Sequence, residues 1–241
     1  MEYARSIKTR DELIVQRRNA EICKKALHLM RDATRPGITA NELWAILVGL
    51  NSALDGDYTE SRMVVSGTRT NPWYTEASDK PLAAGELLGI DTDMVGPYSY
   101  SCDMSRTWLC KPGAPTDEQK TLYKLAFDQV HHNMALLKPG VAFSELVEKS
   151  WSCPDRYRDL ECGCILHGIG MCNEYPMLSQ KRDYRREGYD GVFEPNMAIC
   201  IESYIGEKGG GEGVKLEQMV QLTEDGYRLV SDFPFEDDLL N

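Results

Sequence analysis

Apolar residues recur at helical spacing in the first part of the chain. Thr9 and Thr39 each stand three residues before a glutamate, Glu12 and Glu42, which is the pattern of a capping box at a helix start. The apolar positions that follow predict one helix from residue 10 to residue 35, ended by a Pro-Gly pair, and a second from residue 40 to about residue 50. The chain therefore begins with two amphipathic helices.

Short apolar runs further along the chain predict strands. These runs lie at 63–66, 87–95, 102–109, 197–205 and 214–222, and turn residues bound them. The runs 87–95 and 102–109 form one predicted hairpin, and the runs 197–205 and 214–222 form a second. A long helix is predicted from residue 116 to about residue 137 between the hairpins. This mixture of helices and hairpins predicts an α+β fold.

A faint internal repeat relates the two halves of the chain. The segment 35–43, RPGITANEL, resembles the segment 138–146, KPGVAFSEL, at an offset of 103 residues. Each copy ends one helix, begins the next, and precedes a hairpin that carries acidic residues. We interpret this order as a duplication, which predicts a pseudo-twofold domain with one site where its halves meet.

Composition and charge narrow the class of protein. The chain has 241 residues with a formal net charge of −11, so it would repel the phosphates of nucleic acids and of anionic membranes. Its longest apolar run, about eight residues, is far shorter than the ~20 residues of a membrane-spanning helix. Eight cysteines without a secretory signal indicate reduced thiols in the cytoplasm. No linker or low-complexity stretch divides residues 1–241, so we expect a single domain.

The first predicted hairpin carries a cluster of carboxylates. Asp91 and Asp93 are two residues apart on a predicted strand and share one face, and Asp103 lies on the returning strand. The strand around them is apolar and looks buried, and buried carboxylates need a counter-charge. Arg106 is the only cation that follows closely. A divalent metal ion is therefore the simplest counter-ion.

The second half of the chain supplies further candidate ligands. His167 stands in an apolar strand, and Glu202 and Glu217 each interrupt an apolar run of the second hairpin. With the three aspartates they form a set of hard oxygens and one imidazole, which suits two divalent ions such as Fe, Mn, Co or Zn. Cys162 and Cys164 with His167 would make a competing zinc motif, but no fourth ligand follows at a suitable spacing.

The order of these motifs resembles that of the pita-bread metalloenzymes. Asp…Asp, His-Gly-Ile-Gly, Ile-Glu-Ser and Gly-Val-Lys-Leu-Glu follow one another as in the peptidase M24 (creatinase-aminopeptidase) group, over residues 5–230. The resemblance implies a pseudo-twofold, antiparallel sheet covered by helices, and a single catalytic domain at 1–241 without the N-terminal domain of creatinase-like relatives. It implies catalysis by Glu202 and metal ligands at Asp103, His167, Glu202, Glu217 and one or both of Asp91 and Asp93.

Departures from the peptidase pattern point to one branch of this group. Peptidases usually carry a second histidine in the motif after His167 and another before the first ligand strand, and this chain has Asn173 near the first place and no histidine at the second. Asn-Pro-Trp-Tyr, Asp-Thr-Asp and Gly-Met-Cys-x-Glu-Tyr-Pro are similar to the metal-dependent dimethylsulfoniopropionate lyases. That similarity implies a catalytic position at Asn173 and four substrate-binding residues: Asn71, Trp73, Tyr74 and Glu174.

The sequence leaves three functional interpretations. The first is a dinuclear metal-dependent lyase that acts on a small carboxylate such as dimethylsulfoniopropionate. The second is an Xaa-Pro aminopeptidase or dipeptidase, in which Glu202 handles the proton of a metal-activated water. The third is a pita-bread domain that binds without catalysis. The expected partners are a small molecule or a short peptide, with no nucleic acid and no membrane, and the resemblance is compatible with a homodimer.

Overall fold

The computed structural model describes all 241 residues, which fold as two halves that each place helices before strands. The first half contains α1 (Glu2–Arg5), α2 (Arg10–Ala33), α3 (Ala40–Ala53), β1 (Tyr58–Thr59), β2 (Val64–Ser66), η1 (Gly67–Thr70), β3 (Leu87–Asp91), β4 (Met94–Val95), η2 (Pro97–Ser99), β5 (Ser101–Cys102) and β6 (Ser105–Leu109). The second half contains α4 (Asp117–Ala135), α5 (Phe143–Lys149), η3 (Arg158–Leu160), β7 (Cys164–Ile169), β8 (Asn173–Ser179), α6 (Lys181–Glu187), β9 (Ala198–Gly206), β10 (Gly213–Leu222), β11 (Tyr227–Leu229) and α7 (Asp237–Leu240).

The helix starts predicted from the capping boxes at Thr9 and Thr39 are confirmed. The Thr9 hydroxyl accepts the Glu12 backbone N–H, and the Glu12 carboxylate accepts the Thr9 backbone N–H. The same reciprocal pair begins α3 at Thr39 and Glu42. These side chains satisfy backbone donors that have no partner inside the helix, which fixes where α2 and α3 begin.

The strands pair in antiparallel order in three sheets. The largest has the order β11-β10-β9-β7-β8, and the two smaller ones have the orders β2-β3-β6 and β1-β4-β5. Thr107 of β6 joins the halves: its hydroxyl donates to the Lys215 carbonyl on β10 at 2.9 Å and accepts the Lys215 backbone N–H at 3.2 Å. The predicted α+β class with antiparallel sheets is therefore confirmed, and the sheets of the two halves meet along β6 and β10.

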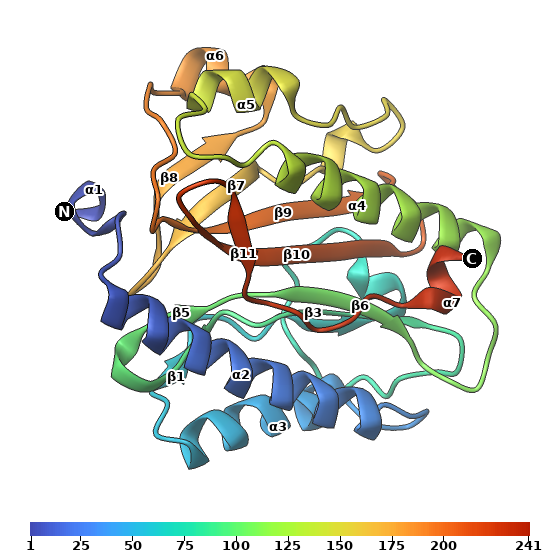
Figure 1. Ribbon diagram of the computed structural model, residues 1–241. Helices are drawn as coiled ribbons and strands as arrows, with labels where there is room; N and C mark the ends of the chain where they lie inside the picture. The colour runs from blue at the N-terminus through green and yellow to red at the C-terminus, as the bar shows by residue number, and fades with distance from the viewer.

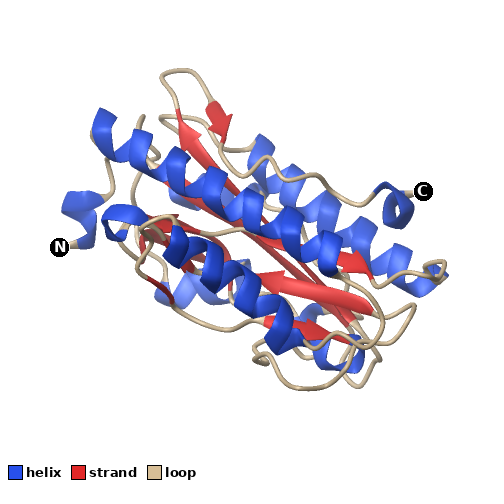
Figure 2. Cartoon of the chain, turned by 90° about the horizontal axis from the view of Figure 1, so that it is seen from below, coloured by secondary structure: helices blue, strands red, loops and turns tan.

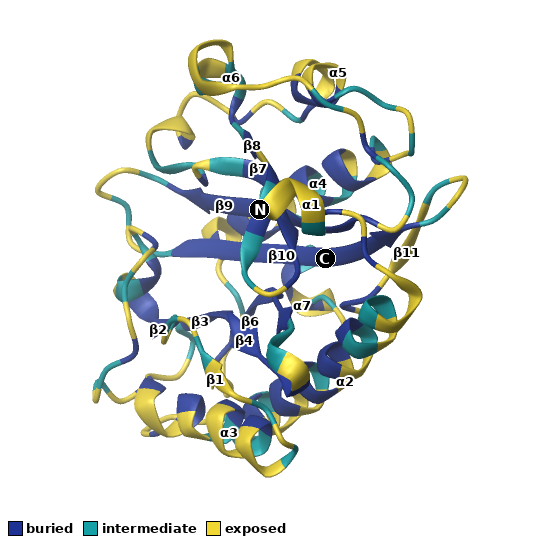
Figure 3. Ribbon diagram, turned by 90° about the vertical axis from the view of Figure 1, so that its left-hand side faces the viewer, coloured by how far each residue is buried: buried dark blue, intermediate teal, exposed yellow.

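Helices cover the strands on both outer sides. The α2 and α3 helices pack on the first-half strands, α4 packs on β9 and β10, and α5 packs on β8, each side with its own apolar core. Figure 1 shows this layered arrangement, and Figure 2 shows the helices lying over the strands when the molecule is viewed from below. The β9 and β10 strands are buried along their whole length (Figure 3), so polar side chains on them face a protected interior.

The repeated segments make matching backbone contacts. Gly37 donates to the Leu82 carbonyl at 2.8 Å, and Leu82 donates back to the carbonyl of the next residue, Ile38, at 2.8 Å. One hundred and three residues later, Gly140 donates to Phe193 at 2.8 Å, and Phe193 donates back to the residue after Gly140 at 3.0 Å. Both glycines have a positive φ, +89° and +85°, which favours glycine at this bend. This correspondence is what a duplication predicts.

The first predicted hairpin needs one correction. The run 87–95 is not a single strand, because β3 ends at Asp91 and β4 begins at Met94. Between them Asp93 has a φ of 36°, which takes the chain out of the extended conformation. Asp91 and Asp93 therefore do not share the face of one regular strand, although both line the same cavity.

None of the helices combines the length and apolar character needed to cross a membrane.

Candidate metal centre

Strand register brings four side chains of the second half to one face. His167 on β7 lies directly opposite Cys200 on β9, and Glu202 on β9 lies directly opposite Glu217 on β10. Cys200 and Glu202 are two residues apart on one strand, so they point to the same side. The antiparallel pairing thus places an imidazole, a thiol and two carboxylates together.

The three aspartates reach the same place from the first half. Asp91 ends β3, and Asp103 lies between β5 and β6, where its carboxylate accepts the Asp93 backbone N–H at 3.0 Å. The Ser105 hydroxyl lies 2.8 Å from Asp91 Oδ1 and 2.7 Å from Glu217 Oε2, so it is within hydrogen-bond distance of carboxylates from both halves. The site therefore forms where the halves meet, as the repeat predicts.

These side chains border a cavity of about 560 Å³. Five of the six predicted ligands line it, and the sixth, Glu217, is fully buried behind them. No predicted ligand is more than 9% exposed. The rest of the lining comes from Met63, Tyr74, Cys162, Gly163, Cys164, Asn173, Met177, Ser179, Glu187, Tyr189 and Lys215.

Lys215 is a cation in this cluster that the sequence analysis missed. Its ammonium lies 2.7 Å from Glu202, 3.2 Å from Asp91 and 3.4 Å from Glu217, and its side chain is 2% exposed. Arg106, the cation that follows the aspartates closely in the sequence, faces elsewhere: its guanidinium donates to the backbone carbonyls of Glu217 and Phe233. Lys215 stands two residues before Glu217 in an apolar strand, and that period-2 spacing is the signal that could have revealed it.

Burial and mutual repulsion shift the acid–base properties of the cluster. Burial, reinforced by the charge of Asp91, raises the pKa of Asp93 to about 6. Burial and the neighbouring carboxylates raise the pKa of Asp103 well above its usual value. Burial would raise the pKa of Glu202 as well, but Lys215 and His167 outweigh it and lower that pKa below its usual value. Clustered carboxylates of this kind are stabilised by cations.

His167 is oriented as a metal ligand would be. Its Nδ1 lies 3.0 Å from the Gly168 carbonyl, which can only accept, so Nδ1 carries the proton. Nε2 faces Glu202 at 3.3 Å and Glu217 at 3.6 Å. Burial alone would lower the pKa of His167, but these two carboxylates raise it well above its usual value.

The residues present fit divalent cations. Two groups bring their ligand atoms within 4.8 Å of one another, His167 with Cys200 and Glu217, and Asp91 with Asp103 and Glu217. Glu217 Oε1 is buried and has no hydrogen-bond partner. A buried oxygen without a partner is costly unless a cation or a donor completes its environment.

The predicted substrate-binding residues divide into two sets. Asn173, at the start of β8, and Tyr74, which is 71% exposed with a φ of 69°, both line the cavity. Trp73 is buried outside this lining and packs against Tyr204 with ring centroids 5.9 Å apart. Asn71 accepts a hydrogen bond from the Tyr204 hydroxyl at 2.9 Å and donates to a backbone carbonyl at 2.7 Å.

Glu174 also lies outside the cavity lining. Its buried carboxylate pairs with Lys8 at 2.6 Å and with Arg5 at 2.8 Å. The structure therefore does not bring Asn71, Trp73 or Glu174 into contact with the cavity. The contacts of Asn71 and Glu174 hold neighbouring segments together, and Trp73 fills the space behind Lys215, whose ammonium is 6.0 Å from the indole ring.

Comparison with known proteins agrees with this geometry. The profile of metallopeptidase family M24 matches residues 15–224, which include all six predicted ligands. The chain belongs to metallopeptidase family M24. Among M24 relatives, a dimethylsulfoniopropionate lyase DddP from Roseovarius nubinhibens is 33% identical over 99% of this chain and 55% of its own length. An Xaa-Pro dipeptidase from Pyrococcus furiosus is 28% identical over 92% of this chain and 62% of its own length.

Solved M24 structures show the same fold. An Xaa-Pro dipeptidase from Bacillus anthracis superposes with a TM-score of 0.84 at 24% identity and covers 98% of this chain and 64% of its own. The prolidase from Pyrococcus furiosus gives a TM-score of 0.83 at 25% identity, over 96% of this chain and 66% of its own. The predicted pita-bread fold is thus confirmed. The chain spans about half the length, 55%, of the DddP relatives it matches.

Proposed function

We propose that this M24 chain is a dinuclear metal-dependent enzyme of the lyase-like branch, which acts on a small carboxylate such as dimethylsulfoniopropionate. The carrying observation is the make-up of the cavity, which presents the predicted metal ligands together with Asn173 and has His167 as its only histidine. The two further histidines that peptidases of this fold bring to the scissile amide have no counterpart in its lining. The similarity to DddP supports the same branch.

Different groups of the cavity lining would bind different parts of the substrate. Bound divalent ions would supply Lewis acidity and a place for the substrate carboxylate. Lys215 contributes a fixed positive charge at the same end and holds Glu202 at 2.7 Å. At the mouth, Tyr74 offers an aromatic face to a cationic group such as a sulfonium. Elimination would transfer a proton from the carbon next to the carboxylate to a nearby base and break the carbon–sulfur bond, whose electron pair leaves with the sulfur, releasing dimethyl sulfide and acrylate.

Asn173 limits the rate of this reaction. An amide can orient a substrate by hydrogen bonds, but it cannot accept a proton near neutral pH. We therefore expect slow elimination by the wild type. Replacing Asn173 by Asp places a carboxylate of tunable pKa on the cavity wall and should raise elimination by about 10²–10⁴-fold, the contribution of a positioned base.

The test compares dimethyl sulfide release by wild type and Asn173→Asp at matched metal content. Asn41→Asp, the same chemical change on the exposed face of α3, is the control and should leave the rate unchanged. A fast wild type that Asn173→Asp does not improve would contradict the assignment of Asn173.

A second candidate is peptide hydrolysis by an Xaa-Pro dipeptidase mechanism. It is favoured by the relatives with that activity and by Glu202, whose carboxylate lines the cavity. A panel of Xaa-Pro dipeptides, assayed beside the lyase substrate, separates the two. Because the accessory histidines are missing, we expect turnover well below the ordinary range of about 1–10³ per second. Turnover within that range would favour the peptidase, and no turnover of either substrate class would favour a binding domain.

A further inference from the structure

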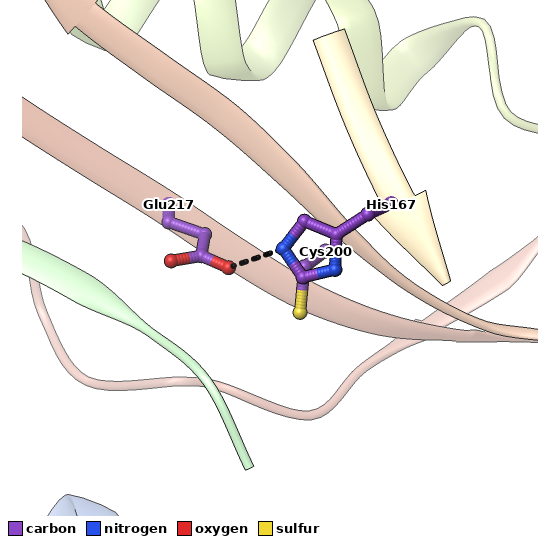
Figure 4. Close-up of side chains that lie close together, drawn as sticks. All are labelled: His167, Cys200 and Glu217. Atoms are coloured by element: carbon purple, nitrogen blue, oxygen red, sulfur yellow. Dashed lines mark ion pairs between the residues drawn. The ribbon is translucent and has the colours of Figure 1, made fainter. Parts of the chain in front are cut away.

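Cys200 lies inside the ligand cluster but belongs to none of the predicted roles. It is fully buried on β9, directly opposite His167 and two residues before Glu202. Figure 4 shows its sulfur converging with the His167 imidazole and the Glu217 carboxylate. The ligand atoms of these three side chains lie within 4.8 Å of one another. Cysteine counts as an apolar residue in a buried strand, so the sequence pattern gave no reason to single it out.

A second observation points to a ligand at this place. Glu217 Oε1 is fully buried, has no hydrogen-bond partner, and faces His167 Nε2 at 3.6 Å. Because Nδ1 of His167 donates to the Gly168 carbonyl, Nε2 is the nitrogen left for a cation. The Glu217 oxygen that lacks a hydrogen bond and the Nε2 atom of His167 thus lie close to the Cys200 sulfur, within 4.8 Å of one another.

We infer that Cys200 is a metal ligand, so that one of the two metal positions has a thiolate. On binding, the thiol gives its proton to solvent and the sulfur forms the bond to the metal. The inference rests on the metal centre of the proposed function. It makes the two positions unlike: His167, Cys200 and Glu217 offer nitrogen, sulfur and oxygen, whereas Asp91, Asp103 and Glu217 offer oxygen alone.

This difference predicts the choice of metal. Thiolate and imidazole ligands favour borderline cations such as Zn²⁺ or Co²⁺ and the soft cation Cd²⁺, whereas all-oxygen sets suit Mn²⁺ or Mg²⁺. The position with Cys200 should therefore take Zn²⁺ or Cd²⁺ in preference to Mn²⁺. Cys200→Ser should weaken Cd²⁺ binding by more than the ~10–100-fold that loss of an outer-shell partner costs, and it should leave Mn²⁺ binding much less affected.

Two other sulfur contacts suggest alternatives to metal ligation by Cys200. Cys200 Sγ lies 3.9 Å from the Asp103 backbone carbonyl, so the thiol could simply donate a weak hydrogen bond within the core. Cys162 is a second thiol near the ligands, with its sulfur 3.6 Å from Glu202 Oε2. An experiment must therefore separate sulfur ligation from no ligation, and Cys200 from Cys162.

The experiment uses the full chain, stripped of metal and titrated with Co²⁺ alone. A thiolate ligand gives a sulfur-to-cobalt charge-transfer band in the near ultraviolet. We expect this band in the wild type and in Cys162→Ser, and its loss in Cys200→Ser. A band that survives in Cys200→Ser and is lost in Cys162→Ser would overturn the inference, as would binding of Co²⁺ without any band. Failure to bind any divalent metal would refute the proposed metal centre itself.

A second measurement does not depend on the folding of Cys200→Ser. It is X-ray absorption of Zn²⁺-loaded protein that carries both Cys162→Ser and Cys164→Ser. These substitutions remove the two thiols of the cavity lining and leave Cys200 in place. A zinc–sulfur distance of about 2.3 Å should remain in that variant. Scattering from nitrogen and oxygen alone would show that Cys200 is a packing residue.

Discussion

Lys215 offers a direct test of how the carboxylate cluster is stabilised without metal. Its ammonium is 2.7 Å from Glu202, and attraction at that separation is worth about 6 kcal/mol at an effective dielectric constant near 20. Removing the ammonium from water offsets several kcal/mol of this gain. Deleting one partner of a buried pair leaves a net loss of about 3–5 kcal/mol, because the remaining charge is uncompensated. We therefore expect Lys215→Met to lower the free energy of unfolding of metal-free protein by about that amount.

Bound metal should change this result. Divalent ions would replace Lys215 as the counter-charge, so the same substitution should cost less in metal-loaded protein. The assay is urea denaturation followed by circular dichroism, in chelator and in excess Mn²⁺, with the slope checked for constancy. Lys111→Met, which removes an exposed lysine paired with Asp238, is the control and should move the midpoint little. An unchanged midpoint for metal-free Lys215→Met would refute the role of Lys215 as the counter-charge. An equal loss of unfolding free energy with and without metal would refute the replacement of Lys215 by metal ions.

Two further predictions follow from the titration of the cluster and from the N-terminal ion pair. Asp93 has a pKa of about 6 in the folded chain against 3.8 ordinarily, so the folded state keeps a proton that the unfolded state releases. The contribution of Asp93 to the stability of metal-free protein should therefore fall by about 3 kcal/mol as pH rises from about 4 to 6. Wild-type stability measured relative to Asp93→Asn should fall over this range, and a rise instead would contradict this sign. Lys8→Met should lower the unfolding free energy by at most about 3–5 kcal/mol, since it leaves the buried Glu174 carboxylate with only the partly exposed Arg5 as a charged partner. Lys24→Met, at a more exposed lysine, should lower the unfolding free energy far less. Equal losses for the two variants would mean that the buried ion pair contributes no more to stability than the exposed one.

The convergence of the six predicted ligands could be anticipated because each contrasts with its surroundings. Glu202 and Glu217 interrupt buried strands, and a carboxylate in such a place needs a partner. The hairpin pattern also placed these two strands side by side, and the observed register sets Glu202 opposite Glu217. Local patterns of period and polarity therefore determined both the fold class and most of the centre.

The features that could not be predicted from the sequence depend mainly on contacts between residues far apart in the chain. The partner of Glu174 is Lys8, 166 positions away, and no periodicity connects them. Cys200 lies in an apolar run and has the hydrophobic character of its neighbours. Lys215 lies two residues before Glu217, and only Glu217 was interpreted as part of the site. The left-handed conformation at Asp93 depends on its contact with Asp103 across the loop, which spacing alone does not reveal.

The separation of Lys8 and Glu174 in the sequence also determines when their ion pair can form during synthesis. The ribosome makes Lys8 first and must add 166 more residues before Glu174 exists, which takes roughly 10–30 s at ~5–20 residues per second. Throughout that interval the amino-terminal segment has no partner on the β7–β8 hairpin, and Lys215 and Glu217 are made later still. The aspartates of the first half therefore lack the second-half members of the centre until Glu217 has been made.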